Sequence, residues 1–554
     1  MTTTVARALG LALAQAGVKT VFGVVGSGNF HVTNALTEGG ARFIAARHEG
    51  GAAAMADAYA RVSGEVGVLS VHQGPGLTNA MTGITEAAKS RTPLLILAPE
   101  ATDPRSNFRI DQAALATAVG AVAARITSPA TAAAELADAY VTARTGRRTV
   151  LLNLPLDVQA APAPAEFPPP VVPRRPLPSA DSEAVAALAD ALTAARRPVF
   201  IGGRGARHAD PYLKALAERS HALLATSAVS RGLFRGDPFN LDVSGGFATP
   251  AAAELIKDAD LLIGWGCALN MWTLRHGTLV GAGTTVVQVD IDADALGAYQ
   301  AVDLGVVGDV GATAQAVLAE LDQRDADAGG GAAGDTGYRT PAVKERLARE
   351  GRWRDVPYEE HDEPGRIDPR TLSIALDDLL PAERTVAVDS GNFMGYPSMF
   401  LDVPDAEGFV FTQAYQAVGL GLASAIGAAI AHPDRLTVAA VGDGGALMGV
   451  SELETAARLG LDLVVVVYDD EAYGAEVHHF APGGYPLDTV RFPATNIAEI
   501  GRGFGCDGVT VTCPADLAAV ADWVKGPRDR ALVVDAKVTR GVPSWWLEDA
   551  FRGH

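Results

Sequence analysis

The 554-residue chain contains little cysteine: Cys267, Cys506 and Cys513 are the only three, and no two of them have the CxxC spacing. We therefore expect neither a disulfide framework nor a zinc site, and the composition suits a reducing compartment such as the cytoplasm. Basic residues are also scarce, with 45 Lys and Arg against 65 Asp and Glu and a formal net charge of −20. Because nucleic-acid binding needs a basic face, we expect no nucleic-acid partner.

Long hydrophobic runs are absent as well. LDLVVVVY (461–468) is as long as a strand and far below the roughly 20 residues of a membrane-spanning helix. The first 18 residues, MTTTVARALGLALAQAGV, fit an amphipathic helix that follows a Thr cap better than they fit a signal peptide. We therefore expect no contact with a membrane and a cytoplasmic location.

What the chain does contain is an alternation of short β-branched runs with Ala-rich helical segments, which is typical of parallel α/β layers. Two segments interrupt it, the proline-dense 160–178 and the polar 322–365, and we interpret both as linkers. The sequence thus predicts three α/β domains with doubly wound parallel sheets, at 1–160, 180–322 and 366–545.

The strongest local motif is VGDGGALMGVSELETAARLGLDLVVVVYDDEAYG. A predicted strand ends at Asp443, a helical segment follows, and the next strand ends at Asp470. Because successive parallel strands end at one edge of a sheet, these carboxylates can converge, and they would suit Mg²⁺. The N–H groups of Gly444 and Gly445 would hold phosphate. Taken alone, a GDGG turn is as readily a plain connection between a strand and a helix.

This segment resembles the cofactor motif of the thiamine diphosphate-dependent enzymes, which begins with GDG and closes with an Asn pair. The resemblance implies that Asp443, the Asp470 side chain and the backbone carbonyl of Ala472 hold Mg²⁺ on the diphosphate. This chain departs from the motif, because it has Asp469 and Asp470 in place of the two Asn. The extra charge could make metal dependence steeper or shift the preferred divalent ion.

A distant segment, RHEGGAAAMADAYARVSG (47–64), is similar to the family's other cofactor motif. On its own, Glu49 would be a carboxylate that caps an Ala-rich helix. The resemblance implies instead that Glu49 hydrogen-bonds N1′ of the aminopyrimidine and so promotes loss of the thiazolium C2 proton. In the family this glutamate and the diphosphate site come from different subunits. We therefore expect a homo-oligomer, with a dimer as the minimum and a tetramer as the expected form.

A third segment, QAVGLGLASAIGAAIA (416–431), looks like the family segment that places an apolar residue under the cofactor. Alignment puts Val418 there, and the alternative is simply a buried helix. Three motifs at the family's spacing are specific for thiamine diphosphate and much less so for the substrate. The cofactor contacts implied by the resemblance are, besides Glu49 and Val418, Gly391, Asn392, Gln416, Asp443, Gly444, Gly445, Asp470, Ala472 and Tyr473.

Four residues align with substrate-facing positions in relatives. Ser27 and His72 match a serine and a proton-relay histidine of benzoylformate decarboxylases. Gln112 matches a pocket glutamine of benzaldehyde lyases, and Glu476 matches an acidic residue of pyruvate decarboxylases. Structural roles are the alternatives: His72 could be a satisfied histidine at a strand end, and Glu476 could be solvated.

The expected middle domain has glycine-rich strand ends, GGRGAR (202–207) and GWGCALN (264–270), which bind FAD or ADP in some relatives. The acetolactate synthases usually carry an Arg-Phe-Asp-Asp stretch where this chain has CALNMWTLRHG. FAD or ADP is therefore a weaker expectation than thiamine diphosphate and Mg²⁺.

Together these segments favour a thiamine diphosphate- and Mg²⁺-dependent carboligase or lyase similar to acetolactate synthase. It would act on a small-molecule 2-oxo acid, with an aldehyde or ketone as acceptor. The first alternative is a non-oxidative 2-oxo acid decarboxylase of the benzoylformate type, favoured by Ser27 and His72. The second is a protein that binds the cofactor without turnover, which only the Asp469–Asp470 departure supports.

Overall fold

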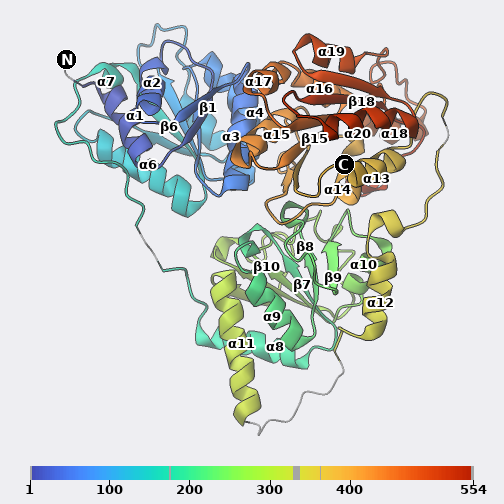
Figure 1. Cartoon of the computed structure of the whole chain (residues 1–554). Helices are drawn as coiled ribbons and strands as arrows, with labels where there is room; N and C mark the ends of the chain where they lie inside the picture. The colour runs from blue at the N-terminus through green and yellow to red at the C-terminus, as the bar shows by residue number, and fades with distance from the viewer. Residues whose placement is uncertain (1–2, 174–175, 328–336, 362, 551–554) are drawn as a thin grey trace.

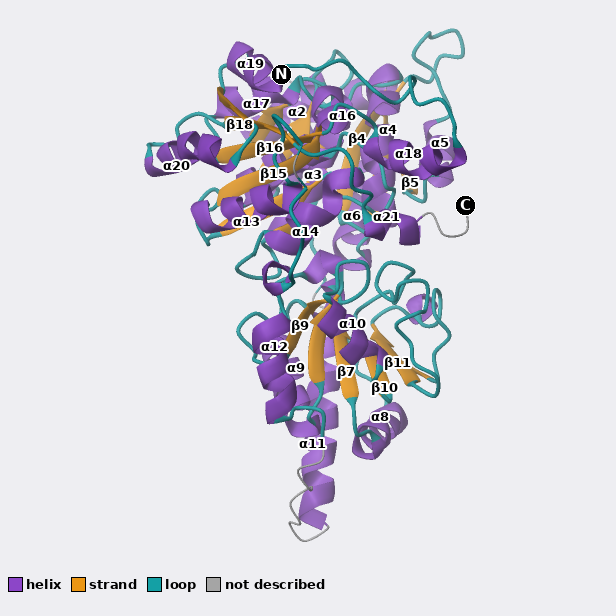
Figure 2. Ribbon diagram, turned by 90° about the vertical axis from the view of Figure 1, so that its right-hand side faces the viewer, coloured by secondary structure: helices purple, strands orange, loops and turns teal. Residues whose placement is uncertain are grey.

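The computed structural model describes residues 3–173, 176–327, 337–361 and 363–550. The chain forms three α/β domains, each built on a six-stranded parallel sheet, as the sequence predicted. The N- and C-terminal domains lie beside each other, with the middle domain below them (Figure 1). Figure 2, turned by 90°, shows the same separation into an upper and a lower part. Within the described residues, no helix has the length and hydropathy to cross a membrane.

The first sheet has the strand order β2-β1-β3-β4-β6-β5. Its strands are β1 (Thr20–Gly23), β2 (Arg42–Ala45), β3 (Gly67–Ser70), β4 (Leu94–Glu100), β5 (Val122–Arg125) and β6 (Thr149–Pro155). The helices around it are α1 (Val5–Gln15), α2 (Phe30–Glu38), α3 (Glu49–Ser63), α4 (Pro75–Lys89), α5 (Gln112–Ala118), α6 (Ala132–Gly146) and α7 (Leu156–Ala160). As predicted, Glu49 is the first residue of the Ala-rich helix α3.

The second sheet has the order β12-β11-β10-β7-β8-β9. Its strands are β7 (Pro198–Gly202), β8 (Leu223–Thr226), β9 (Asn240–Val243), β10 (Leu261–Trp265), β11 (Thr285–Asp290) and β12 (Leu304–Val307). Its helices are α8 (Ser182–Ala194), α9 (Asp210–Ser220), α10 (Pro250–Lys257), α11 (Val310–Asp327) and α12 (Pro341–Glu350).

The expected linker 322–365 is in part wrong, because it contains α12, which packs on the middle domain. The hydroxyl of Tyr338 donates to the Leu255 carbonyl at 2.7 Å, and Leu347 joins the apolar cluster around α10. The segment is polar on average, so its composition did not reveal the few buried residues that attach it to the middle domain. The glycine-rich run at 328–336 and Arg174–Arg175 of the proline-dense segment lie outside the described residues.

The third sheet has the order β14-β13-β15-β16-β18-β17. Its strands are β13 (Arg384–Val388), β14 (Phe409–Phe411), β15 (Leu436–Gly442), β16 (Leu463–Asp469), β17 (Asp507–Val511) and β18 (Leu532–Lys537). Its helices are α13 (Pro369–Leu379), α14 (Gly395–Phe400), α15 (Gly421–Ala431), α16 (Asp443–Met448), α17 (Glu452–Leu459), α18 (Gly474–Phe480), α19 (Ile497–Gly503), α20 (Ala518–Lys525) and α21 (Trp545–Ala550). Since β13, β15 and β16 are neighbours, the turns that follow them share one edge.

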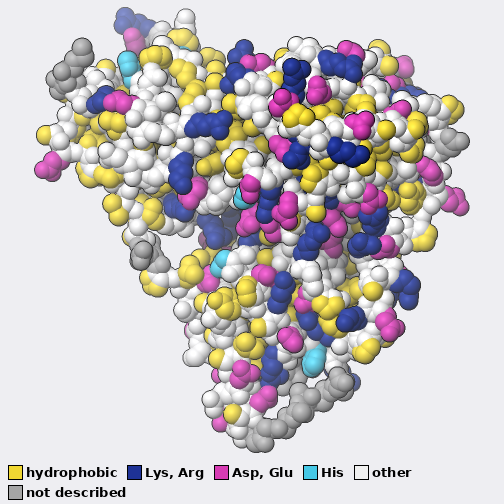
Figure 3. Space-filling view, viewed as in Figure 1, with side chains coloured by type: hydrophobic (Ala, Val, Ile, Leu, Met, Phe, Trp, Pro, Cys, Tyr) yellow, Lys and Arg dark blue, Asp and Glu magenta, His cyan; other side chains and the backbone are white. Residues whose placement is uncertain are grey.

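The N- and C-terminal domains are joined by close packing of α3 against α15 (Figure 1). A Cβ added at Gly427 would lie 2.1 Å from the Met55 carbonyl oxygen, so the two backbones touch at this point. The many Ala and Gly residues of both helices therefore serve this contact, since larger side chains would separate the domains. Charged side chains of both signs are interspersed over the face shown in Figure 3.

Candidate active site

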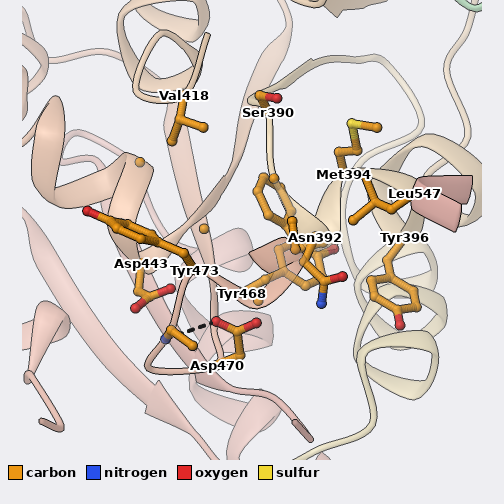
Figure 4. Close-up of a pocket in the computed structure, with 18 of the residues that line it drawn as sticks. Ser390, Asn392, Met394, Tyr396, Val418, Asp443, Tyr468, Asp470, Tyr473 and Leu547 are labelled. Atoms are coloured by element: carbon orange, nitrogen blue, oxygen red, sulfur yellow. Dashed lines mark hydrogen bonds between the residues drawn. The ribbon is translucent and has the colours of Figure 1, made fainter. Parts of the chain in front are cut away.

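A pocket of about 280 Å³ opens at the edge of the third sheet where β13, β15 and β16 end (Figure 4). Its position is the one at which open parallel sheets bind ligands. All candidate residues that the sequence placed in the third domain line it: Gly391, Asn392, Gln416, Val418, Asp443, Gly444, Gly445, Asp470, Ala472, Tyr473 and Glu476.

Two carboxylates, those of Asp443 and Asp470, face the same part of this pocket (Figure 4). Burial raises the pKa of Asp443 above its usual range, and repulsion from Asp470 raises it further. Burial likewise raises the pKa of Asp470, which an N–H donated by Ala472 partly offsets. Burial is the largest cause of both shifts and the negative charge of Asp469 adds to both, so a bound cation would relieve the cost of keeping these carboxylates ionised.

The backbone around Ala472, which also lines the pocket, is held by a short pairing with residues 490–492. Tyr473 N–H donates to the Val490 carbonyl at 2.8 Å, and Phe492 N–H donates to the Glu471 carbonyl at 2.8 Å. These bonds flank Ala472, whose own N–H donates to Asp470 Oδ1 at 3.2 Å. The Ala472 carbonyl therefore takes no part in this pairing. Glu471 has a φ of +56°, a left-handed conformation that is unusual for a residue other than glycine and is often found at functional sites.

The C-terminal segment forms part of the pocket wall. Ser544 Oγ lies 2.7 Å from both the carbonyl and the side-chain Oδ1 of Asn392, so its one proton is shared between them, and the Asn392 amide hydrogen-bonds the Asp470 carboxylate. Trp546 is buried and packs edge-on against Tyr396. Leu547 lines the pocket itself (Figure 4). Two tryptophans, Trp545 and Trp546, are adjacent in this segment, and Trp546 packs beside the pocket.

Asp389, which sequence reasoning missed, supports the loop that carries Val418. It follows β13 and is fully buried. Its carboxylate accepts the N–H groups of Ser390 at 2.8 Å, of Gly419 at 2.9 Å and of Leu420 at 3.2 Å. Val418 itself stands before α15, with 41% of its surface exposed, rather than within a buried helix. The Asp-Ser-Gly-Asn run at the end of a predicted strand was the signal that could have revealed Asp389.

The predicted residues of the first domain gather at the edge of the first sheet. Glu49 accepts a hydrogen bond from Asn79 Nδ2 at 3.1 Å, and a Cβ at Gly76 would lie 3.3 Å from its other oxygen. The ring of His72 lies next to Gly26, and its Nδ1 lies 2.8 Å from the Gln73 carbonyl. Because a carbonyl only accepts, Nδ1 donates, and Nε2 of the neutral ring is the acceptor.

Ser27 and Gln112 belong to the same edge. Ser27 Oγ lies 3.4 Å from His72 Nε2, so the hydroxyl faces the accepting nitrogen. The ring of Phe108 stands edge-on to His72, with 5.1 Å between the ring centroids. Gln112 begins α5 but is buried, and its amide donates to Asn153 Oδ1 at 2.7 Å. That bond fixes Gln112 against β6 and uses one N–H of its amide.

The structure therefore shows two groups of candidate residues, and within the described part of one chain only the group of the third domain lines this pocket. Of the described residues that line the pocket, all belong to the third domain except Trp272, which comes from the middle domain. Glu49, His72, Ser27 and Gln112 are not among them. Sequence reasoning also missed Trp272, Gln413 and Leu547, since tertiary packing alone brings them to the wall.

The glycine-rich turns of the middle domain are explained by their contact with each other. A Cβ at Gly203 would lie 2.2 Å from the Gly266 carbonyl oxygen, and one at Gly205 would lie 2.8 Å from the Gly266 Cα. Arg204 donates to the Ser90 carbonyl of the first domain. These glycines let two turns touch and give no support to the expected FAD or ADP site.

Comparisons with known proteins agree with this architecture. Three family models match the chain: the thiamine pyrophosphate enzyme N-terminal TPP-binding domain at residues 3–123, the central domain at 185–317 and the C-terminal TPP-binding domain at 389–536. A protein of Pseudomonas aeruginosa named as a probable 2-ketoarginine decarboxylase is 32% identical over 93% of this chain and 90% of its own length.

Two further relatives carry other names. The sulfoacetaldehyde acetyltransferase of Rhodobacter capsulatus is 30% identical over 84% of this chain and 81% of its own length. The acetolactate synthase large subunit of Parasynechococcus marenigrum is 29% identical over 97% of this chain and 88% of its own length. With the three domains matched in order and such relatives over nearly the whole length, the chain belongs to the thiamine pyrophosphate enzyme family.

Proposed function

We propose that this protein is a thiamine diphosphate- and Mg²⁺-dependent carboligase or lyase that acts on 2-oxo acids, similar to acetolactate synthase. The observation that carries the proposal is the convergence of Asp443, Asp470 and Ala472 in one pocket, where the Ala472 carbonyl would be the third oxygen. These are hard oxygen ligands, which Mg²⁺ prefers, and the metal usually completes its shell with phosphate and water. The raised pKa values of the two carboxylates support a cation between them.

The rest of the pocket suits the cofactor. Gly444 and Gly445 lie in the first turn of α16, where N–H groups have no intrahelical partner and can donate to a diphosphate. A Cβ at Gly474 would lie 2.2 Å from Asp470 Oδ2, so glycine keeps the carboxylate in place. Val418 would support the ring system from below. When bound, the cofactor supplies a nucleophilic carbon that adds to the carbonyl of a 2-oxo acid.

The active enzyme we propose is at least a homodimer, with Glu49 of one chain completing the pocket of the other. Exposed apolar side chains flank both groups of candidate residues. Met448 is 58% exposed beside the pocket, and Phe30 and Phe108 are 51% and 43% exposed around Ser27 and His72. Apolar surfaces of this kind mark interfaces. Association of these two surfaces from different chains would bury the exposed apolar side chains of each. It would also bring Glu49 of one chain to the aminopyrimidine of the cofactor held by the other.

In such a site His72, Ser27 and Glu476 would face the substrate. Ser27 would donate to the substrate carboxylate, and Glu476 of α18 lines the pocket where the acceptor would approach. Gln112 is a weaker candidate, because its amide is committed to Asn153. The accepting Nε2 of His72 can take a proton, and it can give one only after the ring is protonated.

The second candidate function is simple decarboxylation of a 2-oxo acid to an aldehyde. The Ser27–His72 pair favours it, and a relative named as a probable decarboxylase is 32% identical to this chain. Ligation is preferred because the resemblance to acetolactate synthase extends over 97% of the chain, and because the Gln73 carbonyl binds Nδ1 of His72 and leaves Nε2 as the acceptor of the neutral ring.

Product identification separates the two. The purified protein is incubated with thiamine diphosphate, Mg²⁺ and either pyruvate or benzoylformate, with and without benzaldehyde, and the products are identified by mass. The proposal predicts acetolactate or another hydroxyketone. Free aldehyde alone would establish the decarboxylase. Glu49→Gln serves as the inactive control, and consumption of neither acid by the wild type would contradict both candidates for these donors.

A further inference from the structure

A carboxylate of the C-terminal domain, Glu452 at the start of α17, reaches into the N-terminal domain. It is buried, with 1% of its surface exposed. Its Oε1 accepts the backbone N–H of His48 at 3.0 Å and of Arg47 at 3.1 Å, and its Oε2 lies 3.3 Å from the Arg47 nitrogen. The hydroxyl of Thr455, in the same helix, donates to Oε2 at 2.7 Å and fixes the side chain.

These bonds are made where α3 begins. The two N–H groups belong to the residues directly before Glu49, which is the first residue of the helix. A Cβ at Gly51 would lie 2.5 Å from Glu452 Oε1, so only glycine lets the carboxylate reach this turn. Gly51 is the second glycine after Glu49 in the sequence. Its small size is thus explained by its contact with Glu452, which lies 401 positions later in the chain.

Glu49 is held from two directions by this arrangement. Asn79 binds one carboxylate oxygen of Glu49 and leaves the other free. Glu452 fixes the two peptide groups ahead of it, and through them the place from which the side chain departs. A carboxylate that must meet a cofactor nitrogen needs such fixing, because a displacement of about 1 Å can cost a hundredfold in rate.

We infer that Glu452 is a positioning residue for Glu49: the C-terminal domain sets the place of the activating glutamate of the N-terminal domain in the same chain. This inference rests on the role of Glu49 in the proposed function. It goes beyond that function because Glu452 does not line the pocket. Glu452 lies nine residues after Asp443. One short segment therefore contains a proposed metal ligand of one active site and the residue that positions Glu49, which would act in the other active site of the dimer.

A neighbouring pair of contacts provides a matched control. Glu454, also in α17, pairs with the Arg47 side chain at 3.5 Å and with Arg458 at 3.1 Å. It bridges the same two domains but touches side chains, not the peptide groups before Glu49. Glu454→Gln therefore removes interdomain charge without releasing the start of α3.

The test measures how fast the C2 proton of bound thiamine diphosphate exchanges with deuterium, by acid quench and NMR. No substrate is added, so the result is independent of which reaction the enzyme catalyses. Cofactor affinity is measured in parallel by quenching of tryptophan fluorescence, and folding by thermal unfolding. The variants are Glu452→Ala, Glu452→Gln and Glu454→Gln, each alone, and Glu452→Ala combined with Glu49→Gln.

Glu452→Ala is expected to slow C2 exchange about tenfold or more, while cofactor affinity changes less than about threefold. Glu452→Gln keeps an oxygen that can accept the backbone N–H groups, so its exchange rate should lie between those of Glu452→Ala and the wild type. Glu454→Gln should stay within about twofold of the wild type. In the Glu49→Gln background, Glu452→Ala should add less than about twofold, because the two residues act through one group. Wild-type exchange in Glu452→Ala, or an equal further loss in that background, would overturn the inference.

A second variant keeps the test decisive if Glu452→Ala does not fold. In Gly51→Ala, residue 452 is still glutamate, but the added methyl group at position 51 pushes the Glu452 carboxylate away from the start of α3. It should slow exchange in the same way, again without additivity in the Glu49→Gln background. An unchanged exchange rate in folded Gly51→Ala would contradict the inference, whereas failure of every 2-oxo acid to react in the wild type would contradict the proposed function only.

Discussion

Asp469 pairs with Lys537, its register partner on the neighbouring strand β18, and not with the pocket. The Lys537 ammonium donates to the Asp469 carboxylate and, at 2.8 Å, to the Thr495 carbonyl. Asp535 lies 3.2 Å from the same ammonium. Of the two carboxylates that replace the family's Asn pair, Asp469 is therefore paired with a lysine beside the sheet edge and acts on the proposed metal site only from a distance, whereas Asp470 lines the pocket itself.

Replacement of Asp470 by Asn tests what that charge does. The amide oxygen can still ligate Mg²⁺, but the attraction of a second carboxylate is lost. We expect Asp470→Asn to lower Mg²⁺ affinity about tenfold, which is about 1.4 kcal/mol. The measurement is the Mg²⁺ concentration that half-saturates the fluorescence change on cofactor binding. Unchanged or tighter Mg²⁺ binding would show that the extra charge does not hold the metal.

Asp469→Asn should act mainly on stability and change Mg²⁺ affinity less than Asp470→Asn does. It removes one of two carboxylates beside a mostly buried ammonium, so we expect the free energy of unfolding to fall by about 1–3 kcal/mol. Asp469→Asn combined with Lys537→Met should recover part of the loss, because no cation is then left underpaired. Denaturant unfolding of the wild type and of these two variants measures this; a loss of Mg²⁺ affinity in Asp469→Asn as large as that in Asp470→Asn would contradict the separation of roles.

Asp389 should give a pH dependence. Burial raises the pKa of Asp389 to about 6, above its usual 3.8. A carboxyl whose pKa is raised by folding contributes most below the unfolded value, and that contribution is lost as pH rises through about 6. The unfolding free energy of the wild type, measured against that of Asp389→Asn, should therefore fall between about pH 4 and pH 6 and level off above that range. A difference that is flat or rises over this range would contradict a raised pKa at Asp389.

His72 distinguishes the two candidate functions. If the enzyme ligates, His72→Ala should keep hydroxyketone formation within about tenfold, because the accepting Nε2 is not the required donor. If it only decarboxylates, loss of a general acid should cost about 10²–10⁴ in rate. Initial rates with pyruvate, and with pyruvate plus benzaldehyde, separate these outcomes. Ser27→Ala is the control for loss of the neighbouring hydroxyl.

Local patterns predicted much of the fold and of the C-terminal half of the site. Glu49 begins α3, and Asp443 and Asp470 lie at adjacent strand ends, because parallel topology and helix-start preferences act over short distances. The predicted helix after Asp443 is, however, two short helices, α16 and α17, with a break between them. The start of α17 is what allows Glu452 to point at the first domain.

Features that depend on distant partners were not predictable from one sequence. Asp469 and Lys537 are 68 positions apart, and only the strand order β16-β18 makes them neighbours. From the sequence alone, Trp546 could equally have contacted another subunit. In the structure it packs against Gly395 and Tyr396 of its own chain. Trp272 reaches the pocket from another domain, and no spacing in the sequence signals that approach.

The most direct test of the whole account asks whether two chains build each site. Glu49→Gln and Asp443→Ala are each inactive by this account, and they are co-expressed with different tags in equal amounts. In a symmetric dimer, half of the dimers are mixed and each has one intact site, so we predict about a quarter of wild-type consumption of the 2-oxo acid. Purified mixed dimers that show no activity would contradict an active site shared between Glu49 of one chain and Asp443 of the other.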